Sequence, residues 1–225
     1  LLFIEGDGDH KWERGEEMWK KFTHLNPKAN YLYKQALDIE TLRTGTYVKR
    51  VEYDHDTGKF TKEHKIRPKK YIVMCGLLSL YLPQMRKNLD LKIYMDSDEE
   101  LRRFWKIQRD IKYRGYTKEK IVEQIEQRMP DARKYIIPQK EYADLVIHYF
   151  DKHLLNCFVE NHDVELSMKL TLSSAVNLEP IIQELSNYDI SIKYDYSEDL
   201  RKQTIIFDGG NLENKKIDFN KIADD

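Results

Sequence analysis

Short apolar runs separated by longer stretches with helical spacing are the feature of this chain that most limits its fold. The runs occupy residues 1–4, 71–75, 91–95 and 145–147. Ile72 and Val73 place β-branched side chains at the centre of the second run, as is typical of a buried strand. Apolar strands that alternate with helices of roughly 10 to 20 residues indicate a parallel α/β sheet whose strands are buried on both faces.

The stretches between these runs carry start and stop signals of helices. We expect helices over residues 13–22, 29–42 and 99–113. Ser97 or Asp98 is placed to cap the third of these helices, and Gly115 is placed to end it. Thr117 is placed to cap a further helix, in which an apolar residue recurs every four positions. Alternation over residues 47–53 predicts a strand.

The sequence pattern changes after Asp151. Polar and apolar residues alternate over residues 154–172 and 190–196. Residues 178–185 have a helical pattern, and residues 204–207 are expected to form a further strand. Alternation of apolar and polar residues is typical of antiparallel strands with one solvated face. We therefore expect a parallel α/β domain over residues 1–150 and a small antiparallel α+β domain over residues 151–225.

The charge balance and the cysteine count exclude several classes of protein. Lysine and arginine total 38 against 39 for aspartate and glutamate, so we expect no general attraction to nucleic acid or to acidic membranes. No apolar run approaches the ~18 residues that a bilayer-spanning helix needs. The two cysteines, Cys75 and Cys157, make no disulfide framework and no four-ligand zinc motif. This cysteine usage favours a reducing, cytoplasmic compartment.

The first candidate site follows the first predicted strand and contains Asp7, His10 and Arg14. Ligands of α/β proteins bind beyond the carboxyl ends of the strands. An aspartate at that place can orient or deprotonate an acceptor hydroxyl, and the two basic side chains can hold an anionic group. The alternative is a polar turn that caps a helix, and the three residues taken alone favour that alternative.

The second candidate site lies in a basic stretch over residues 106–115. On a helix, Arg109 and Asp110 follow Lys106 by three and four residues, so the three side chains share one face. Arg114 follows Asp110 by four residues, at the end of the same helix. Mobile basic segments of this kind close over phosphates in phosphoryl-transfer enzymes, because guanidinium groups neutralise the transferring charge. The alternative is a solvated helix face with ion pairs.

Five sequence blocks resemble one enzyme family. The blocks are YDHDTG at 53–58, LDLKIY at 89–94, KIQRD at 106–110, RG at 114–115 and PQKEYADLVI at 138–147. They resemble the corresponding blocks of the phosphoribulokinase and uridine kinase family, in the same order along residues 1–150. By its residues alone, the last block is a helix end or turn that feeds a strand.

The resemblance implies a fold, a reaction and a set of site residues. The fold is a P-loop-kinase-like parallel sheet flanked by helices, and the reaction is phosphoryl transfer from ATP, with Mg²⁺, to a hydroxyl. Asp7 matches the catalytic base of the family. The substrate-binding positions of the family match His10, Arg14 and Arg114. Its lid positions match Lys106, Arg109 and Asp110. The D-x-x-H spacing and the NPKAN block at 26–30 resemble the sugar-phosphate kinases more than the nucleoside kinases.

One departure from the family pattern concerns the phosphate-binding loop. The motif G-x-x-x-x-G-K-[ST], which cradles nucleotide phosphates, does not occur in the chain. In the family this loop precedes the strand that begins here at Leu1. Because the chain also lacks an initiator methionine, we expect it to be cut from a longer one and to be inactive by itself.

A second departure concerns the metal. At residues 75–78 the chain has CGLL, where the family has an acidic residue that helps to organise Mg²⁺. A neutral thiol is a poor ligand for so hard a cation, so the sequence leaves the metal ligands unknown. Glu5 is a candidate to substitute for the missing acidic residue. We expect Cys75 to be a buried, unreactive apolar residue.

Three functional hypotheses follow from these observations. The leading one is an ATP-dependent kinase that phosphorylates a hydroxyl of a sugar phosphate or a nucleoside. The alternative, motivated by Cys75, is a kinase-like module that has lost catalysis and binds a nucleotide or a partner. The third is an α/β domain with neither activity, which the joint occurrence of Asp7, His10 and Arg14 disfavours. The expected partner is a small-molecule substrate, and the sequence leaves homo-oligomerisation open.

Overall fold

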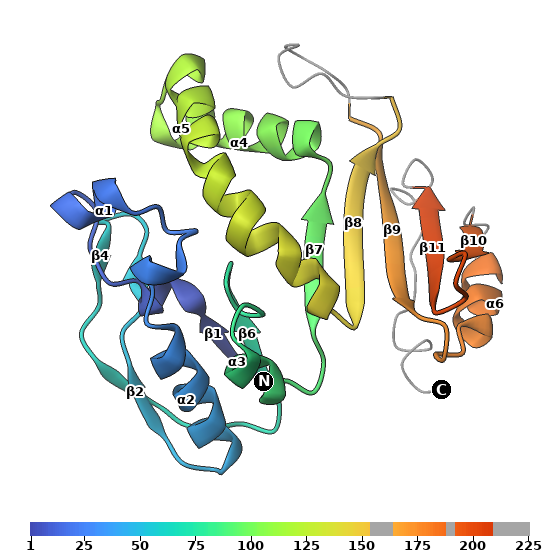
Figure 1. Ribbon diagram of the computed structural model, residues 1–225, viewed down its shortest axis with the longest axis horizontal. Helices are drawn as coiled ribbons and strands as arrows, with labels where there is room; N and C mark the ends of the chain where they lie inside the picture. The colour runs from blue at the N-terminus through green and yellow to red at the C-terminus, as the bar shows by residue number, and fades with distance from the viewer. Residues whose placement is uncertain (154–163, 188–191, 209–225) are drawn as a thin grey trace. The chain divides into compact units, whose positions relative to one another are not determined.

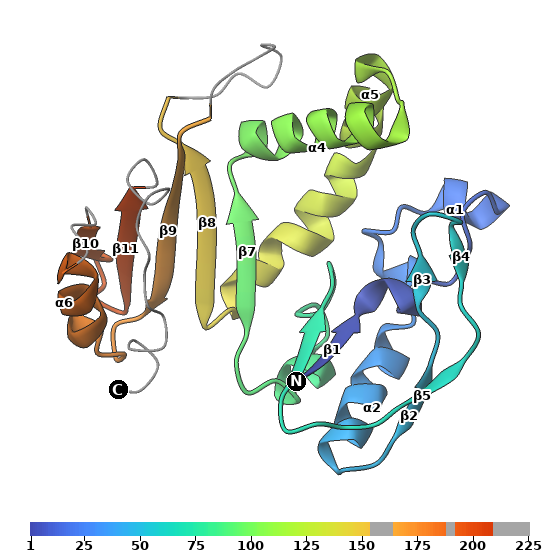
Figure 2. The same cartoon turned by 180° about the vertical axis from the view of Figure 1, so that it is seen from behind.

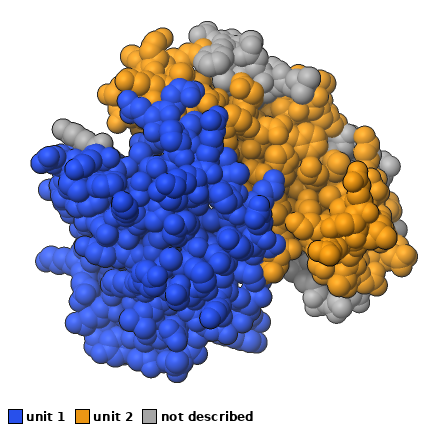
Figure 3. Space-filling view, in the orientation of Figure 1, with its two compact units in different colours: residues 1–92, 126–143 blue, residues 93–125, 144–225 orange. Residues whose placement is uncertain are grey.

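The computed structural model of the chain describes residues 1–153, 164–187 and 192–208. Contacts between residues divide the chain into two compact units (Figure 3). Unit 1 consists of residues 1–92 and 126–143, and unit 2 consists of residues 93–125 and 144–225. The predicted domain boundary at residue 150 stays a prediction.

Two parallel strands form the sheet at the core of unit 1. Strand β1 (Leu2–Glu5) pairs with β6 (Ile72–Cys75) in a register that sets Leu2 opposite Ile72 and Glu5 opposite Cys75 (Figure 1). These strands are the first and second apolar runs of the sequence. Their parallel pairing confirms the α/β interpretation of those runs.

One face of this strand pair is buried and the other is exposed. The buried face packs with helix α2 (Leu32–Arg43) in a cluster that contains Ile4, Ala36, Ile39, Leu42 and Met85. On the other face, Phe3 and Val73 lie opposite each other and are 55% and 42% exposed. Because successive side chains point to opposite faces and α2 covers only one of them, the prediction of burial on both faces is wrong for β1 and β6.

Unit 1 begins with less helix than its sequence pattern predicts. Helix α1 covers Glu17–Lys21 instead of 13–22. Gly15 has a φ of +100°, a left-handed conformation that stops a helix, so the preceding residues form turns. Pro27 then opens the 3₁₀ turn η2 (Pro27–Ala29), which delays the start of α2 relative to the predicted residue 29.

Two small antiparallel pairs of strands follow α2. They are β2 (Val48–Arg50) with β5 (His64–Ile66), and β3 (Tyr53–Asp54) with β4 (Lys59–Phe60). The strand predicted over 47–53 is therefore interrupted after Arg50, and β5 has no counterpart among the predicted strands. Gly58, with a φ of +74°, closes the turn between β3 and β4. After β6, the chain forms turns and the short helix α3 (Pro83–Lys87).

Unit 2 contains a five-stranded sheet in the order β10-β11-β9-β8-β7 (Figure 2). The strands are β7 (Ile93–Ser97), β8 (Leu145–Asp151), β9 (Leu166–Ser173), β10 (Ile192–Tyr196) and β11 (Lys202–Asp208). β7 and β8 are parallel, whereas every later pairing is antiparallel. Helix α6 (Glu179–Asn187) packs on the antiparallel part through Leu185, which clusters with Ile205 and Phe207. The predicted alternation over residues 154–163 lies outside the described residues.

Helices α4 (Glu99–Arg114) and α5 (Lys118–Asp131) follow β7, and their ends largely match the predicted signals. Gly115 ends α4 in the left-handed conformation, and the Thr117 hydroxyl accepts a hydrogen bond from the amide of Lys120. Asp98 occupies the N-cap position of α4, but its carboxylate caps no amide and lies 3.0 Å from Nε2 of His148. A better partner on β8 therefore displaces the predicted cap.

A π-helical turn, η3 (Ala132–Ile136), and a 3₁₀ segment, η4 (Ile137–Tyr142), lead from α5 to β8. Pro130 lies one residue before the end of α5, as its position in the sequence predicts. None of the helices that the structure describes is long and apolar enough to cross a bilayer.

Candidate active site

Asp7 lies on η1 (Gly6–Asp9), the 3₁₀ turn that follows the carboxyl end of β1. Its side chain is 51% exposed, and its Oδ2 lies 3.1 Å from Nε2 of His55. His55 comes from the turn between β3 and β4, and its side chain is 55% exposed. An accessible carboxylate next to an imidazole can accept a proton from a hydroxyl that reaches it.

Arg14 lies against the same turn as His55. Its Nη2 donates a hydrogen bond to the His55 carbonyl over 2.7 Å, and its amide donates to the Gly58 carbonyl over 2.9 Å. A Cβ on Gly58 would lie 2.7 Å from that of Arg14, so this approach requires glycine. The guanidinium is exposed and available to an anion. Asp7 and Arg14 therefore meet at one turn.

His10 is buried, with 6% of its surface exposed, between Trp12 and Trp19. Its Nδ1 lies 2.9 Å from the Trp12 carbonyl and 3.2 Å from the Trp12 amide, and its Nε2 has no hydrogen-bond partner among the described residues. Burial lowers the pKa of His10, which favours the neutral imidazole. The shorter contact, to the Trp12 carbonyl, is that of an Nδ1–H donor, which leaves Nε2 of the neutral ring as an unprotonated hydrogen-bond acceptor.

The same carboxyl end of the β1–β6 pair brings Glu5 and Cys75 side by side. Cys75 is exposed, so the prediction that it is buried is wrong; it lies on the face that α2 does not cover. Partial desolvation raises the pKa of its thiol, and the negative charges of Glu5 and Asp7 raise it further. A protonated thiol is a weak ligand for Mg²⁺.

The described residues do not by themselves make a magnesium site. Among them, no three His, Cys, Asp or Glu side chains gather in a way that could hold a metal ion. Glu5 offers one carboxylate beside Cys75, which is less than the several oxygen ligands that Mg²⁺ takes.

In unit 2, the predicted lid residues converge on one buried carboxylate on α4. Asp110, whose side chain is fully buried, accepts hydrogen bonds from Lys106 over 2.6 Å and from Arg109 over 2.8 Å, with Arg114 at 3.3 Å. Burial acts to raise the pKa of Asp110, but these hydrogen bonds outweigh it and hold the pKa below its ordinary value. The side chains of Arg109 and Arg114 stay 54% and 43% exposed, so they can reach a ligand.

The block at 138–147 serves unit 1 as an anchor. Gln139 is buried, accepts a hydrogen bond from the Leu80 amide over 2.9 Å, and donates to the carbonyls of Leu77 and Tyr135. These bonds fix the segment that follows Cys75. By its residues alone this block has little functional weight, and the contacts of Gln139 within it are structural.

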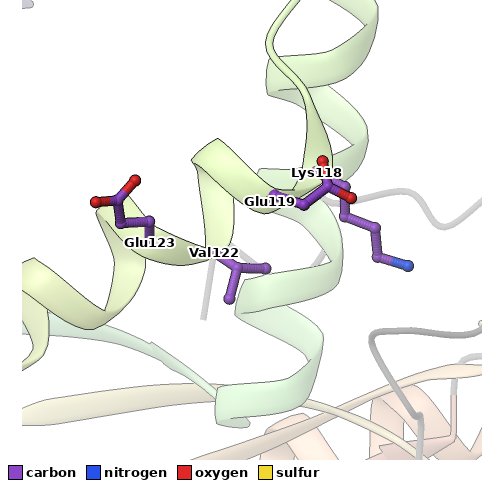
Figure 4. A pocket seen from close by; sticks show the side chains of 4 residues that line it. All are labelled: Lys118, Glu119, Val122 and Glu123. Atoms are coloured by element: carbon purple, nitrogen blue, oxygen red, sulfur yellow. The ribbon is translucent and has the colours of Figure 1, made fainter.

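A shallow hollow of about 470 Å³ lies beside the first turns of α5 (Figure 4). Four residues line it: Lys118, Glu119, Val122 and Glu123. It contains none of the predicted site residues.

The residues that sequence reasoning missed are His55 and the buried ion pair of Asp9, on η1, with Arg50. His55 belongs to the YDHDTG block, which carries the family resemblance as a whole without a role for any single residue. The polar residues of that block, in a turn between two short strands, are the signal that could have identified it.

The fold has a solved counterpart. The structure matches that of a phosphoribulokinase from Rhodobacter spheroides with a TM-score of 0.71, over 94% of this chain and 81% of that one, at 20% sequence identity. The fold is therefore that of the phosphoribulokinase class of P-loop kinases, a mixed α/β fold with parallel strands flanked by helices.

Sequence comparison shows the family. The profile of the phosphoribulokinase / uridine kinase family matches residues 7–156, and the chain belongs to this family. It is 38% identical over 149 residues to a phosphoribulokinase of Synechocystis and 30% identical over 145 residues to a uridine kinase of Clostridium perfringens. These matches cover 66% and 59% of the chain. The chain spans 45% of the length of the first relative and 70% of the second.

Proposed function

We propose that this chain is part of an ATP-dependent kinase that transfers a phosphoryl group to a hydroxyl of a small molecule. The observation that carries the proposal is the meeting of Asp7 and Arg14 at His55, in a member of the phosphoribulokinase / uridine kinase family. An accessible carboxylate and an exposed guanidinium at one turn are what an anionic acceptor with a reactive hydroxyl requires.

Asp7 is the proposed base. Its carboxylate accepts the proton of the acceptor hydroxyl, and the neighbouring His55 imidazole holds the carboxylate in place. Arg14 is the proposed contact to a phosphate of the acceptor, and the family resemblance adds His10, whose Nε2 is buried without a partner among the described residues, to the same substrate-binding set. Both are on unit 1, close to Asp7 in sequence, so they orient the acceptor toward the base.

The cluster on α4 supplies positive charge. Three cations, Lys106, Arg109 and Arg114, surround the single charge of Asp110, which leaves an excess of positive charge on the helix. We propose that Asp110 holds these side chains in one arrangement and that they neutralise phosphate charge during transfer. ATP and Mg²⁺ are proposed from the family; when bound, the metal would screen the phosphate charge.

The acceptor proposed first is a sugar phosphate. The relative at 38% identity is named a phosphoribulokinase, whereas the uridine kinase is 30% identical. The exposed side chain of Arg14 also suits an acceptor that already carries a phosphate. Cysteine usage supports a cytoplasmic location, which is part of the same proposal.

The alternative is a kinase-like module that binds a nucleotide or partner without turnover. The specific observation in its favour is Cys75, which replaces an acid that the family uses and is poorly suited to Mg²⁺. Cys75→Glu separates the two functions: an increase in turnover of about tenfold or more would indicate a degenerate site. Unchanged turnover, where the wild type already turns over, would be compatible with an enzyme adapted to the thiol.

The proposed function is tested by phosphoryl transfer in the complete natural protein. ATP and Mg²⁺ are supplied with ribulose 5-phosphate or uridine, the acceptors that the names of the relatives indicate, and the phosphorylated product is measured. The proposal predicts product with the sugar phosphate. Nucleotide binding without product from either acceptor would favour the module, and neither binding nor product would reject the kinase.

A further inference from the structure

A buried ion cluster lies directly behind the turn that carries Asp7. The Arg50 side chain is 2% exposed and donates through Nη2 to Asp9 over 2.7 Å and through Nη1 to Asp38 over 2.8 Å. Asp9 and Asp38 are 2% and 12% exposed at their side chains. One guanidinium therefore bridges two carboxylates inside unit 1.

Further donors complete the cluster. Gln35 on α2 donates to the same oxygen of Asp9 over 2.9 Å, and Lys34 donates to Asp38 over 2.7 Å. Arg50 also lies 3.4 Å from the carbonyl of Glu5, the last residue of β1. Two cations thus balance two anions, and the carboxylates are tied to β2 and to side chains of α2.

Burying such a cluster is unfavourable unless each charge is paired. The desolvation of two carboxylates and a guanidinium offsets most of their mutual attraction, and apolar side chains of similar size would often stabilise a fold as well. Stability alone is therefore a weak explanation for the cluster. A role in holding two segments of unit 1 in a fixed arrangement explains why the charges are buried here.

The chain connectivity shows which geometry is fixed. Asp9 is two residues from Asp7 on η1, and Arg50 ends β2, from which the chain continues through β3 to His55. The two segments also touch directly, since a Cβ on Gly8 would lie 2.3 Å from the carbonyl oxygen of Val51. The Asp9–Arg50 ion pair therefore joins the segment that carries Asp7 to the segment that carries His55.

We propose that Arg50 is a positioning residue that sets the Asp7–His55 pair through its bond to Asp9. Arg50 itself is buried and touches no substrate. Its guanidinium holds η1 against the end of β2, so that the Asp7 carboxylate and the His55 imidazole stay within hydrogen-bond distance. The catalytic part of this inference rests on the proposed role of Asp7 as base.

The test is a double-mutant cycle in the complete natural protein. Arg50→Lys keeps the positive charge but cannot donate to Asp9 and Asp38 with the geometry of a guanidinium. The substitution is made in the wild-type protein and in the Asp7→Asn variant. We expect turnover to fall by about tenfold or more in the wild type and by less than about twofold when Asp7 is absent, because Arg50 acts through Asp7. Arg43→Lys is the control, since Arg43 makes an equally two-pronged pair with Asp90 on the surface.

Equal losses of turnover in both backgrounds would overturn the inference, because they would mean a general structural role. The absence of a loss in the wild type would also overturn it. If Arg50→Lys fails to fold, as measured by circular dichroism and thermal unfolding, Gln35→Leu replaces it in the same cycle, since it removes one hydrogen bond to Asp9.

A second readout separates this inference from the proposed function. The imidazole NMR signals of His55 should move to the same positions in Arg50→Lys as in Asp7→Asn, because both variants separate His55 from the Asp7 carboxylate. This holds whether or not the protein is a kinase. Inactive wild-type protein would reject the function alone, whereas unmoved His55 signals in Arg50→Lys would reject the positioning role.

Discussion

Nε2 of His55 lies 3.1 Å from Oδ2 of Asp7, although the two residues belong to segments far apart in the sequence. Both side chains are about half exposed, so the pair is accessible to a ligand. Arg14 bonds the backbone of His55 on the same turn. These contacts place the carboxylate of Asp7, the imidazole of His55 and the guanidinium of Arg14 at one turn.

Removing His55 should weaken the proposed reaction without abolishing it. His55→Asn takes away the partner that orients the Asp7 carboxylate, so we expect turnover in the complete protein to fall by about tenfold. His64→Asn is the matched control, because His64 is an exposed histidine of the same unit near Glu52. Equal effects of the two substitutions would contradict a specific role of His55.

His10 should make the folded state less stable in acid. Burial lowers the pKa of His10 in the folded protein, so the unfolded chain binds more protons as the pH falls below the ordinary histidine value of 6.5. The stabilising contribution is present above that value and is lost as the pH falls through the folded pKa. Urea unfolding at a series of pH values should show this loss in the wild type and a smaller loss in His10→Gln. An unchanged pH dependence in the variant would contradict the assignment.

Asp110 should hold the basic residues of α4 together. Asp110→Asn removes a buried charge to which Lys106, Arg109 and Arg114 bond, and we expect the free energy of unfolding to fall by about 1–3 kcal/mol. The cations are partly exposed and can turn to water, which keeps the loss below that of a fully buried pair. Asp90→Asn, on the surface, should change stability by less than about 0.5 kcal/mol. Equal changes in the two variants would show that the buried cluster has no special role.

Cys75 should react slowly with alkylating reagents although it is exposed. Partial desolvation and the charges of Glu5 and Asp7 raise the pKa of the thiol, so little thiolate forms at neutral pH. In a Cys157→Ser background, iodoacetamide should modify Cys75 more slowly than a free thiol of ordinary pKa. Glu5→Gln should increase the rate, and Glu63→Gln, an exposed glutamate elsewhere in unit 1, should not. A rate insensitive to Glu5 would contradict the electrostatic explanation.

The parts of the fold that the sequence predicts well depend on local pattern. Apolar β-branched runs predict β1 and β6, and Gly115 predicts the end of α4, because each signal acts within a few residues. The clustering of Lys106, Arg109 and Asp110 is also local, since helical spacing places them on one face.

The parts that could not be predicted depend on partners distant in the sequence. Nothing in the sequence indicates that Arg50 is buried between Asp9 and Asp38, because arginine is usually exposed. Of the two predicted caps, Ser97 and Asp98, Asp98 takes the N-cap position, but its carboxylate caps no amide because His148 competes for it from another strand. The extent of burial of β1 and β6 also depends on which elements cover the sheet, which periodicity does not show.

The most direct test of the central claim is phosphoryl transfer from γ-labelled ATP to a sugar phosphate by the complete natural protein, with and without Asp7→Asn. If Asp7 is the base, the wild type forms labelled product and the variant turns over about 100 to 10,000 times more slowly, with the fold unchanged by circular dichroism. A decrease of less than about threefold would remove Asp7 from that role, and the absence of labelled product from the wild type would contradict the kinase itself.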